Sequence, residues 1–159
     1  MKYSAFLFVS ICMLTTYAYT YNRCPSCPQF WTQWGSSCYR YFERVRSWRD
    51  AESTCYSDNI GGHLVSIHSS HEQQFVYNLW QTTHPGERLW IGLSDQRREG
   101  YFIWSDGTTT TDYSAWKSGE PNNSNGNEDG VMLYRKYHGL WNDQRDTDHY
   151  SFVCKVRAG

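Results

Sequence analysis

The sequence Leu89-Trp90-Ile91-Gly92-Leu93 begins the part of the chain that decides the fold. Short runs rich in aromatic and branched apolar residues, bounded by turn residues, predict β-strands. Four further runs of this kind follow, at Tyr101–Trp104, Val131–Tyr134, Gly139–Trp141 and Tyr150–Val153. The second half of the chain is therefore expected to be rich in strands.

Two helices are predicted upstream of these strands, after a strand over residues 37–42. Ser47 can cap the first helix because Asp50 follows three residues later and apolar residues then share one helix face. The run Asn59–Gly62 is expected to end it. The second helix is predicted over residues 70–80, where large apolar residues recur at helical spacing.

The composition limits both the number of domains and the class of partner. A length of 159 residues allows one domain with its own core. The formal net charge of −1 provides no basic field for nucleic acid or for an anionic membrane surface. The chain has 8 Trp and 13 Tyr, which favours a loop-rich fold with an aromatic core.

The N-terminus has the pattern of a secretory signal peptide over residues 1–18. Lys2 precedes an apolar run over residues 5–14, and small residues follow. This run is too short to span a bilayer, and the alternative is a buried N-terminal strand. We expect a secreted, extracellular chain with a short lead over residues 19–26 and a domain over residues 27–157.

Removal of this segment leaves an odd number of cysteines. In an oxidising compartment one thiol must stay free or pair with another chain, and counting does not reveal the pairing. A redox or zinc role for Cys24-Pro25-Ser26-Cys27 is disfavoured, because no βαβ pattern surrounds it and no second cysteine pair lies at metal-ligand spacing. The five cysteines are Cys24, Cys27, Cys38, Cys55 and Cys154.

A long stretch between Trp104 and Val131 has few residues able to form a core. It is rich in Gly, Asn, Ser, Thr and Asp. Compact domains rarely carry such a loop unless it is functional or held in place. A bound metal would meet both conditions.

Eight short motifs occur in a specific order along the chain. They are Cys27-Pro28-x-x-Trp31, Cys38-Tyr39, Gly62–Ile67, Trp90–Leu93, Phe102-x-Trp104-Ser-Asp-Gly107, Glu120-Pro121-Asn122, Trp141-Asn142-Asp143 and Phe152-Val153-Cys154. Each motif is weak alone, but with this order and spacing the chain resembles the C-type lectin family along nearly all of its mature length. The resemblance implies an α+β fold with two helices, two small antiparallel sheets and a long calcium-binding loop.

The resemblance also implies a disulfide arrangement. It pairs Cys55 with Cys154 and Cys27 with Cys38. Cys24 is left over, and we expect it to link two chains into a homodimer or a higher oligomer.

The chain departs from the family at its second core disulfide. Gly130 and Asp146 occupy the two positions where the family usually has cysteines. Such a bridge typically contributes ~2–4 kcal/mol, so the loop is expected to depend more on metal for rigidity.

The resemblance assigns a primary calcium site that also binds sugar. Calcium takes six to eight oxygen ligands, and these acidic and amide side chains would repel one another without a cation. Any one of them alone would be an ordinary solvated loop residue. The resemblance also implies a cis bond before Pro121, which would direct the side-chain oxygens of Glu120 and Asn122 to the same ion. The five residues are Glu120, Asn122, Glu128, Asn142 and Asp143.

The Glu-Pro-Asn order is similar to that of the mannose-type subgroup. It implies binding of mannose, N-acetylglucosamine, glucose or fucose on glycoproteins or cell surfaces. An auxiliary calcium site is also implied, with Asn123 where an Asp is usual. Asn122-Asn123-Ser124 is formally a glycosylation sequon, and a glycan on Asn122 would block the sugar site. The auxiliary residues are Asp95, Glu99, Asn123, Glu128 and Asp129.

Three rival functions are weighed against this lectin. His63, His68 and His71 lack an open zinc motif, and no nucleophile elbow supports Ser-His-Asp catalysis, so a hydrolase is disfavoured and no enzyme is predicted. A structural or protein-binding module on the same fold is the second hypothesis. A galactose-binding lectin is the third. No nucleic-acid partner and no membrane insertion are expected.

Overall fold

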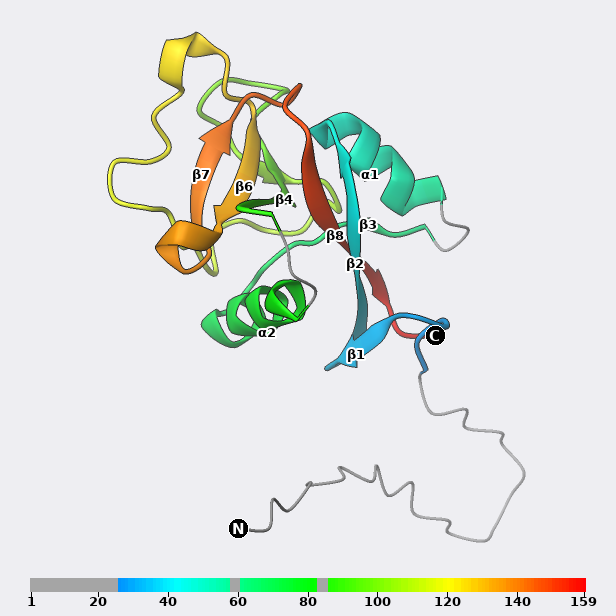
Figure 1. Ribbon diagram of the computed structural model, residues 1–159. Helices are drawn as coiled ribbons and strands as arrows, with labels where there is room; N and C mark the ends of the chain where they lie inside the picture. The colour runs from blue at the N-terminus through cyan, green and yellow to red at the C-terminus, as the bar shows by residue number, and fades with distance from the viewer. Residues whose placement is uncertain (1–25, 58–60, 83–85) are drawn as a thin grey trace, which may run out of the picture.

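The computed structural model describes residues 26–57, 61–82 and 86–159 (Figure 1). The predicted signal peptide, Cys24 and residues 59 and 60 lie outside this part of the chain. The described residues form the α+β fold expected from the sequence. In chain order the elements are β1 (Thr32–Trp34), β2 (Ser37–Arg46), α1 (Trp48–Ser57), β3 (His63–Leu64), α2 (Ser70–Gln81), β4 (Arg88–Ser94), β5 (Ile103–Trp104), η1 (Ser124–Gly126), β6 (Gly130–Tyr134), η2 (Arg135–Tyr137), β7 (Leu140–Gln144) and β8 (Tyr150–Arg157).

The strands form two antiparallel groups that are joined into one sheet. The main order is β1-β2-β8-β4-β6-β7, with β3 on β8 and β5 on β4. All pairings are antiparallel except that of β4 with β8, which runs through Leu89↔Ser151 and Trp90↔Phe152. The two small antiparallel sheets expected from the resemblance correspond to these two groups, and the β4–β8 pairs join them into one sheet.

Side-chain caps fix where both helices begin. The backbone N–H of Asp50 donates to Ser47 Oγ at 3.2 Å, and that hydroxyl donates to Asp50 Oδ2 at 2.8 Å. Ser69 accepts from the Glu72 N–H at 3.1 Å and caps α2. These bonds satisfy donors that have no partner within the helix. Both predicted helices are confirmed.

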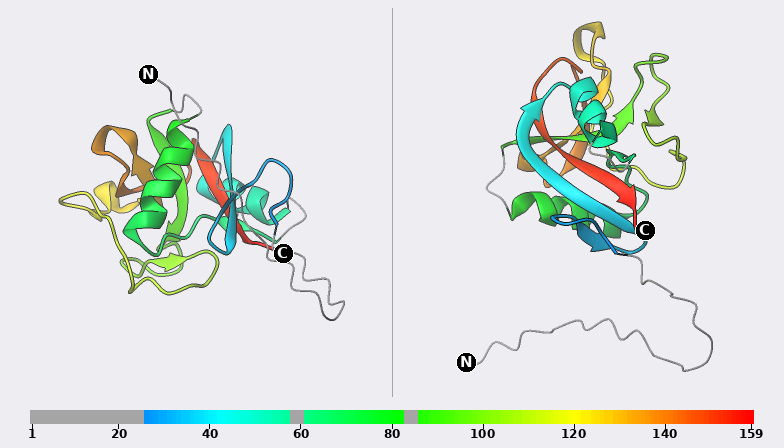
Figure 2. Two further views of the ribbon diagram at one scale, coloured as in Figure 1. Left: turned by 90° about the horizontal axis from the view of Figure 1, so that it is seen from below. Right: turned by 90° about the vertical axis from the view of Figure 1, so that its right-hand side faces the viewer.

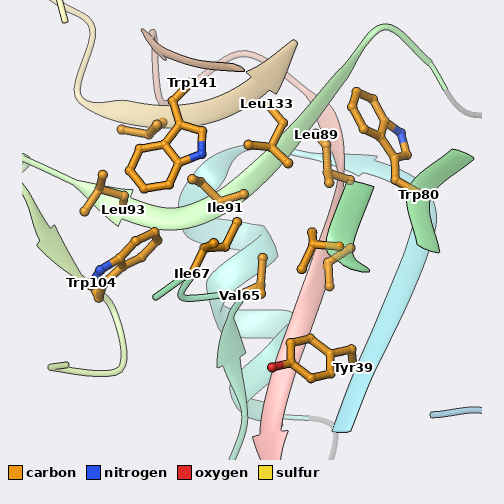
Figure 3. Packing of buried hydrophobic residues seen from close by; sticks show 13 residues of the cluster. Tyr39, Val65, Ile67, Trp80, Leu89, Ile91, Leu93, Trp104, Leu133 and Trp141 are labelled. Carbon is orange, nitrogen blue, oxygen red and sulfur yellow. The ribbon is translucent and has the colours of Figure 1, made fainter. Parts of the chain in front are cut away.

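Two clusters rich in aromatic residues form the core, and each contains residues of one helix. The two helices themselves lie apart from each other (Figures 1 and 2). The cluster with residues of α2 includes Trp80, Trp104 and Trp141, all essentially buried (Figure 3). The cluster with residues of α1 includes Trp90 and Phe152. The aromatic core expected from composition is confirmed, and these tryptophans are core residues rather than an exposed stacking platform.

Among the residues that the structure describes, two disulfides hold the ends of the domain. Cys27 pairs with Cys38 across the β1–β2 hairpin, and Cys55 pairs with Cys154 to tie α1 to β8. Both pairings implied by the family resemblance are present. Within the described ranges, no helix has the length and apolar character required to cross a bilayer.

Candidate calcium and sugar site

The long loop between β5 and β6 is anchored on β7 before it reaches the site. Lys117 donates its backbone N–H to Trp141 O at 2.9 Å, and Trp141 donates to Ala115 O at 2.8 Å. The Trp116 ring packs against Trp141 with centroids 5.7 Å apart. This short pairing fixes the approach to Glu120, and Figure 1 shows the loop in yellow beside β7.

Asp143 on β7 organises the turn that contains the Glu-Pro-Asn motif. Its side chain is 1% exposed. The Asn122 N–H donates to both carboxylate oxygens at 3.0 and 3.1 Å, and the Asn123 N–H donates to Oδ2 at 2.7 Å. The Glu120-Pro121 bond is cis, as the resemblance implied. A residue on the sheet thereby determines how the loop motif is presented.

The other primary residues join this turn through hydrogen bonds. Asn122 donates its amide to Glu120 Oε2, and Asn142 donates its amide to the Asp143 carbonyl. Glu128 accepts the Ser124 N–H at 2.8 Å. The structure therefore brings four of the five predicted primary residues into direct contact and places Glu128 at the end of the same loop.

Lys117 is a site residue that the sequence analysis missed. Its Nζ lies 2.6 Å from Glu120 Oε1, and the Glu120 side chain is 5% exposed. The hydrogen bond to the Glu120 carboxylate raises the pKa of the Lys117 ammonium group above its ordinary value. The signal available in the sequence was a lysine three residues before an acidic one, although this spacing is common in turns.

The carboxylates of the site repel one another. Burial raises the pKa of Glu128, and the charges of Asp143 and Glu120 add to the effect. Burial also raises the pKa of Asp129, with Asp146 and Asp95 as like-charged neighbours. A cation among these groups would relieve the repulsion.

The auxiliary residues lie next to the primary group. Burial raises the pKa of Asp95, and the charges of Glu99 and Asp143 contribute. Asp95 Oδ2 accepts the Gly100 N–H at 2.8 Å, whereas Oδ1 is buried without a hydrogen-bond partner. Asn123 accepts the Glu128 N–H at 3.1 Å and so links the two predicted sets.

The carboxylate and amide oxygens of the two predicted sets fit calcium in type and number, although they do not surround a common point. Over residues 26–57, 61–82 and 86–159, no three His, Cys, Asp or Glu side chains already converge as metal ligands. The reason is visible in the contacts: the carboxylates accept bonds from Lys117, Asn122 and backbone amides. A calcium ion held by this set would take some of the same carboxylate oxygens as ligands.

Trp48 occupies the place of the missing second disulfide. A Cβ built on Gly130 would lie 3.0 Å from Trp48 Cδ1. Trp48 donates its indole N–H to Ile91 O at 2.8 Å and its backbone N–H to Asp146 O at 2.8 Å. Asp146 also accepts from Gln96 at 2.9 Å. Packing and hydrogen bonds therefore connect the elements that the bridge would have linked.

His63 and His68 contact carboxylates that belong to neither predicted calcium site. His63 Nδ1 lies 2.6 Å from Glu52 and His68 Nδ1 lies 2.9 Å from Asp112. Each of these rings bonds a carboxylate of a neighbouring segment. These contacts support the structural reading of His63 and His68, while His71 is exposed on α2.

Comparison with known proteins identifies the family. The profile described as "Lectin C-type domain" matches residues 44–156. The chain belongs to the C-type lectin family. A mannose-binding isoform of C-type lectin from Oxyuranus scutellatus is 37% identical over 159 residues, with 96% of this chain and 98% of that protein covered.

Two further C-type lectins extend the comparison. An alpha-N-acetylgalactosamine-specific lectin from Patiria pectinifera is 39% identical and covers 83% of this chain and 81% of that protein. The crystal structure of the C-type lectin CEL-I from Cucumaria echinata aligns with a TM-score of 0.79 at 36% identity, over 84% of this chain and 99% of that one. The family is one of carbohydrate-binding domains, and the C-type lectin fold expected from the sequence is confirmed.

Proposed function

We propose that this chain is a secreted, calcium-dependent lectin that binds mannose-type sugars without altering them. The observation that supports this most is the Asp143 carboxylate, which receives the backbone of Asn122 and Asn123 and gathers the motif beside β7. Calcium would be held by the side-chain oxygens of Glu120, Asn122, Glu128, Asn142 and Asp143.

Calcium would supply the coordination positions for two neighbouring sugar hydroxyls. The side chains of the chain supply the selectivity. Glu120 accepts hydrogen bonds only, whereas the Asn122 amide also donates. The Lys117 ammonium group, 2.6 Å from Glu120 Oε1, would share the Glu120 carboxylate with the metal.

A second calcium ion would be held by Asp95, Glu99, Asn123, Glu128 and Asp129. The unpartnered buried Oδ1 of Asp95 supports this assignment. Since Asn123 contributes no charge, this site, with four carboxylates, should bind calcium more weakly than one with an Asp at position 123.

In the motif the carboxylate of Glu120, which only accepts hydrogen bonds, precedes the amide of Asn122, which also donates them. This order favours mannose, N-acetylglucosamine or fucose over galactose. The relatives bind both sugar classes by name at similar identity, so overall similarity does not decide the sugar. The local donor and acceptor order is the better guide. A galactose-binding lectin is the alternative if another group orients the ring.

Affinity chromatography tests the proposal. The protein should be retained on mannose-agarose in millimolar calcium and released by a chelator. The double variant Glu120→Gln, Asn122→Asp should keep calcium but shift inhibition from free mannose toward free galactose. Asn127→Gln, at an exposed amide of the same loop, should behave as the wild type. Retention without calcium, or strongest inhibition of the wild type by galactose, would overturn the proposal.

A structural or protein-binding module is the second candidate. The observation that favours it is the Lys117–Glu120 contact, which satisfies the motif carboxylate internally. If this is the function, calcium should bind weakly and no simple sugar should compete. Isothermal calorimetry with calcium followed by mannose separates the two candidates.

A further inference from the structure

Two adjoining cavities lie beside β5 and share part of their walls. The larger has a volume of about 630 Å³ and the smaller about 270 Å³. Tyr101, Trp104 and Thr110 line both of them. We name the two cavities together the threonine cleft, after the run Thr108–Thr111 that lines the larger one. The larger volume falls within the range of ligand sites in proteins, ~300–1,000 Å³.

The indole N–H of Trp104 is a buried donor without a partner. The side chain is 1% exposed, and among the described residues its Nε1 atom has no hydrogen-bond acceptor. Figure 3 shows this nitrogen at the end of the ring that lies farther from Ile67. Ser105, the next residue, lines the larger cavity, and its hydroxyl also has no partner there. Buried polar groups nearly always have a hydrogen-bond partner, so these two atoms call for one from outside the chain.

Three other tryptophans of the core have satisfied indole groups. Trp48 Nε1 donates to Ile91 O at 2.8 Å, and Trp90 Nε1 donates to Arg46 O at 3.0 Å. Trp141 Nε1 donates to Gln73 Oε1 at 2.9 Å. Trp104 differs from these three in that it borders a cavity on two sides and donates to no described residue.

The rest of the threonine cleft offers an apolar surface together with hydroxyl groups. Tyr101 is 62% exposed, and its ring provides a flat apolar face. The hydroxyls of Thr109 and Thr111 lie 2.9 Å apart, and a hydroxyl both donates and accepts hydrogen bonds. The charged residues that line the larger cavity are Arg97 and Glu52, which have opposite signs, and none of the described residues that line the smaller cavity is charged. These walls suit a neutral ligand with many hydroxyls and one apolar face.

We propose that the threonine cleft binds a neutral oligosaccharide that contains N-acetylhexosamine, without calcium. The acetamido group is the part of such a sugar that matches Trp104. Its carbonyl oxygen accepts the indole N–H, directly or through one ordered water, because the nitrogen itself is buried in the wall. Its methyl group suits the aromatic side chains of the smaller cavity, which include Phe102, Tyr113 and Trp116. The sugar ring lies against Tyr101, and its hydroxyls bond to the threonine hydroxyls.

The threonine cleft is distinct from the proposed calcium and sugar site. Its lining includes none of the residues assigned to the primary or the auxiliary calcium ion. Gln96 and Gly100 border it, in the segment that carries Asp95 and Glu99. A second glycan site would let one domain hold two branches at once, which strengthens attachment to a branched or dense glycan. The proposal goes beyond the proposed lectin function and does not depend on it.

Titration with N,N′-diacetylchitobiose in EDTA tests the proposal, because the chelator removes binding that requires calcium. The indole N–H signal of Trp104 in ¹H–¹⁵N spectra, assigned by its loss in Trp104→Phe, should shift as the sugar is added. The signal of Trp34 on β1, assigned in the same way, should stay in place. The shift of the Trp104 signal should also appear in calcium with excess free mannose, which occupies the proposed calcium site.

Matched variants and a matched sugar identify the groups involved. Trp104→Phe keeps an aromatic ring but removes the donor, so it should weaken binding about two- to tenfold. Trp34→Phe, the same change outside the cleft, should bind as the wild type. Cellobiose, which lacks the acetamido carbonyl, should also bind about two- to tenfold more weakly than diacetylchitobiose. Tyr101→Ala removes the exposed ring and should weaken the binding of both sugars.

Three results would overturn the proposal. One is a Trp104 signal that does not move at tens of millimolar diacetylchitobiose. Another is equal affinity for cellobiose and diacetylchitobiose, which would show that the acetamido group makes no contact. A third is equal affinity of the wild type and Trp104→Phe. If Trp104→Phe did not fold, Tyr101→Ala would take its place, since its side chain is mostly exposed, and unchanged affinity in that variant would overturn the proposal.

Discussion

Glu72 is a buried charge on which three parts of the fold converge. It is 3% exposed. Its Oε1 accepts from Tyr39 Oη and from Lys155 Nζ, both at 2.6 Å, and its Oε2 accepts the His68 N–H at 2.8 Å. The substitution Glu72→Gln keeps the shape of the side chain but replaces one acceptor oxygen with a donor and removes the negative charge.

The expected loss of stability is about 3–5 kcal/mol, because a buried ion pair that loses one partner leaves the other charge uncompensated. Lys155 would keep its hydrogen bonds to Ser66, at 3.0 and 3.2 Å, but would lose the carboxylate charge of its ion pair. Urea denaturation followed by tryptophan fluorescence measures the change. A second substitution, Lys155→Met, in the Glu72→Gln background should recover part of the loss, since the unpaired charge is removed.

Glu87→Gln provides a matched control. Glu87 forms an ion pair with Arg135 at 2.7 Å, but their side chains are 56% and 38% exposed. An exposed pair contributes at most about 1 kcal/mol, so this variant should be nearly as stable as the wild type. If Glu72→Gln lost no more stability than Glu87→Gln, the reasoning from burial would be refuted.

Three further predictions concern the loop, the core and assembly. The pKa of Glu128 is raised in the folded, metal-free state, chiefly by burial, so that state binds a proton more tightly than the unfolded chain. Without calcium, stability should therefore rise as pH falls from neutral toward the ordinary Glu pKa, and the stabilisation that calcium provides should shrink over the same range. Melting curves in calcium or in EDTA at several pH values measure both effects. A melting midpoint that does not change with calcium would contradict them. Gly130→Ala should lose about 1–3 kcal/mol, because its Cβ would lie 3.0 Å from Trp48, whereas Gly86→Ala, with open space around it, should lose little by urea denaturation. Cys24→Ser should convert a dimer to a monomer on non-reducing gels, and a monomer in both lanes would argue against the interchain bond.

The candidate site was predictable in its residues but not in its internal contacts. The order of Glu120, Asn122 and Asp143 along the chain carries the family pattern, and the structure places them together. The Lys117–Glu120 contact depends on where the loop turns, which is decided by the pairing of Trp116 with Trp141. Such pairings join residues 25 positions apart, so no local pattern specifies them.

The sequence by itself determined the helices, most strands and the aromatic core, because caps and apolar periodicity act over a few residues. Only the tertiary structure decided the parallel contact of β4 with β8, which joins the two antiparallel groups. It also decided that Trp48 fills the space beside Gly130 and that Arg40 and Arg44 enclose Phe42. The physical reason is that close packing depends on the shapes of neighbours brought together from distant positions, whereas a cap or a strand pattern needs only the adjacent chain.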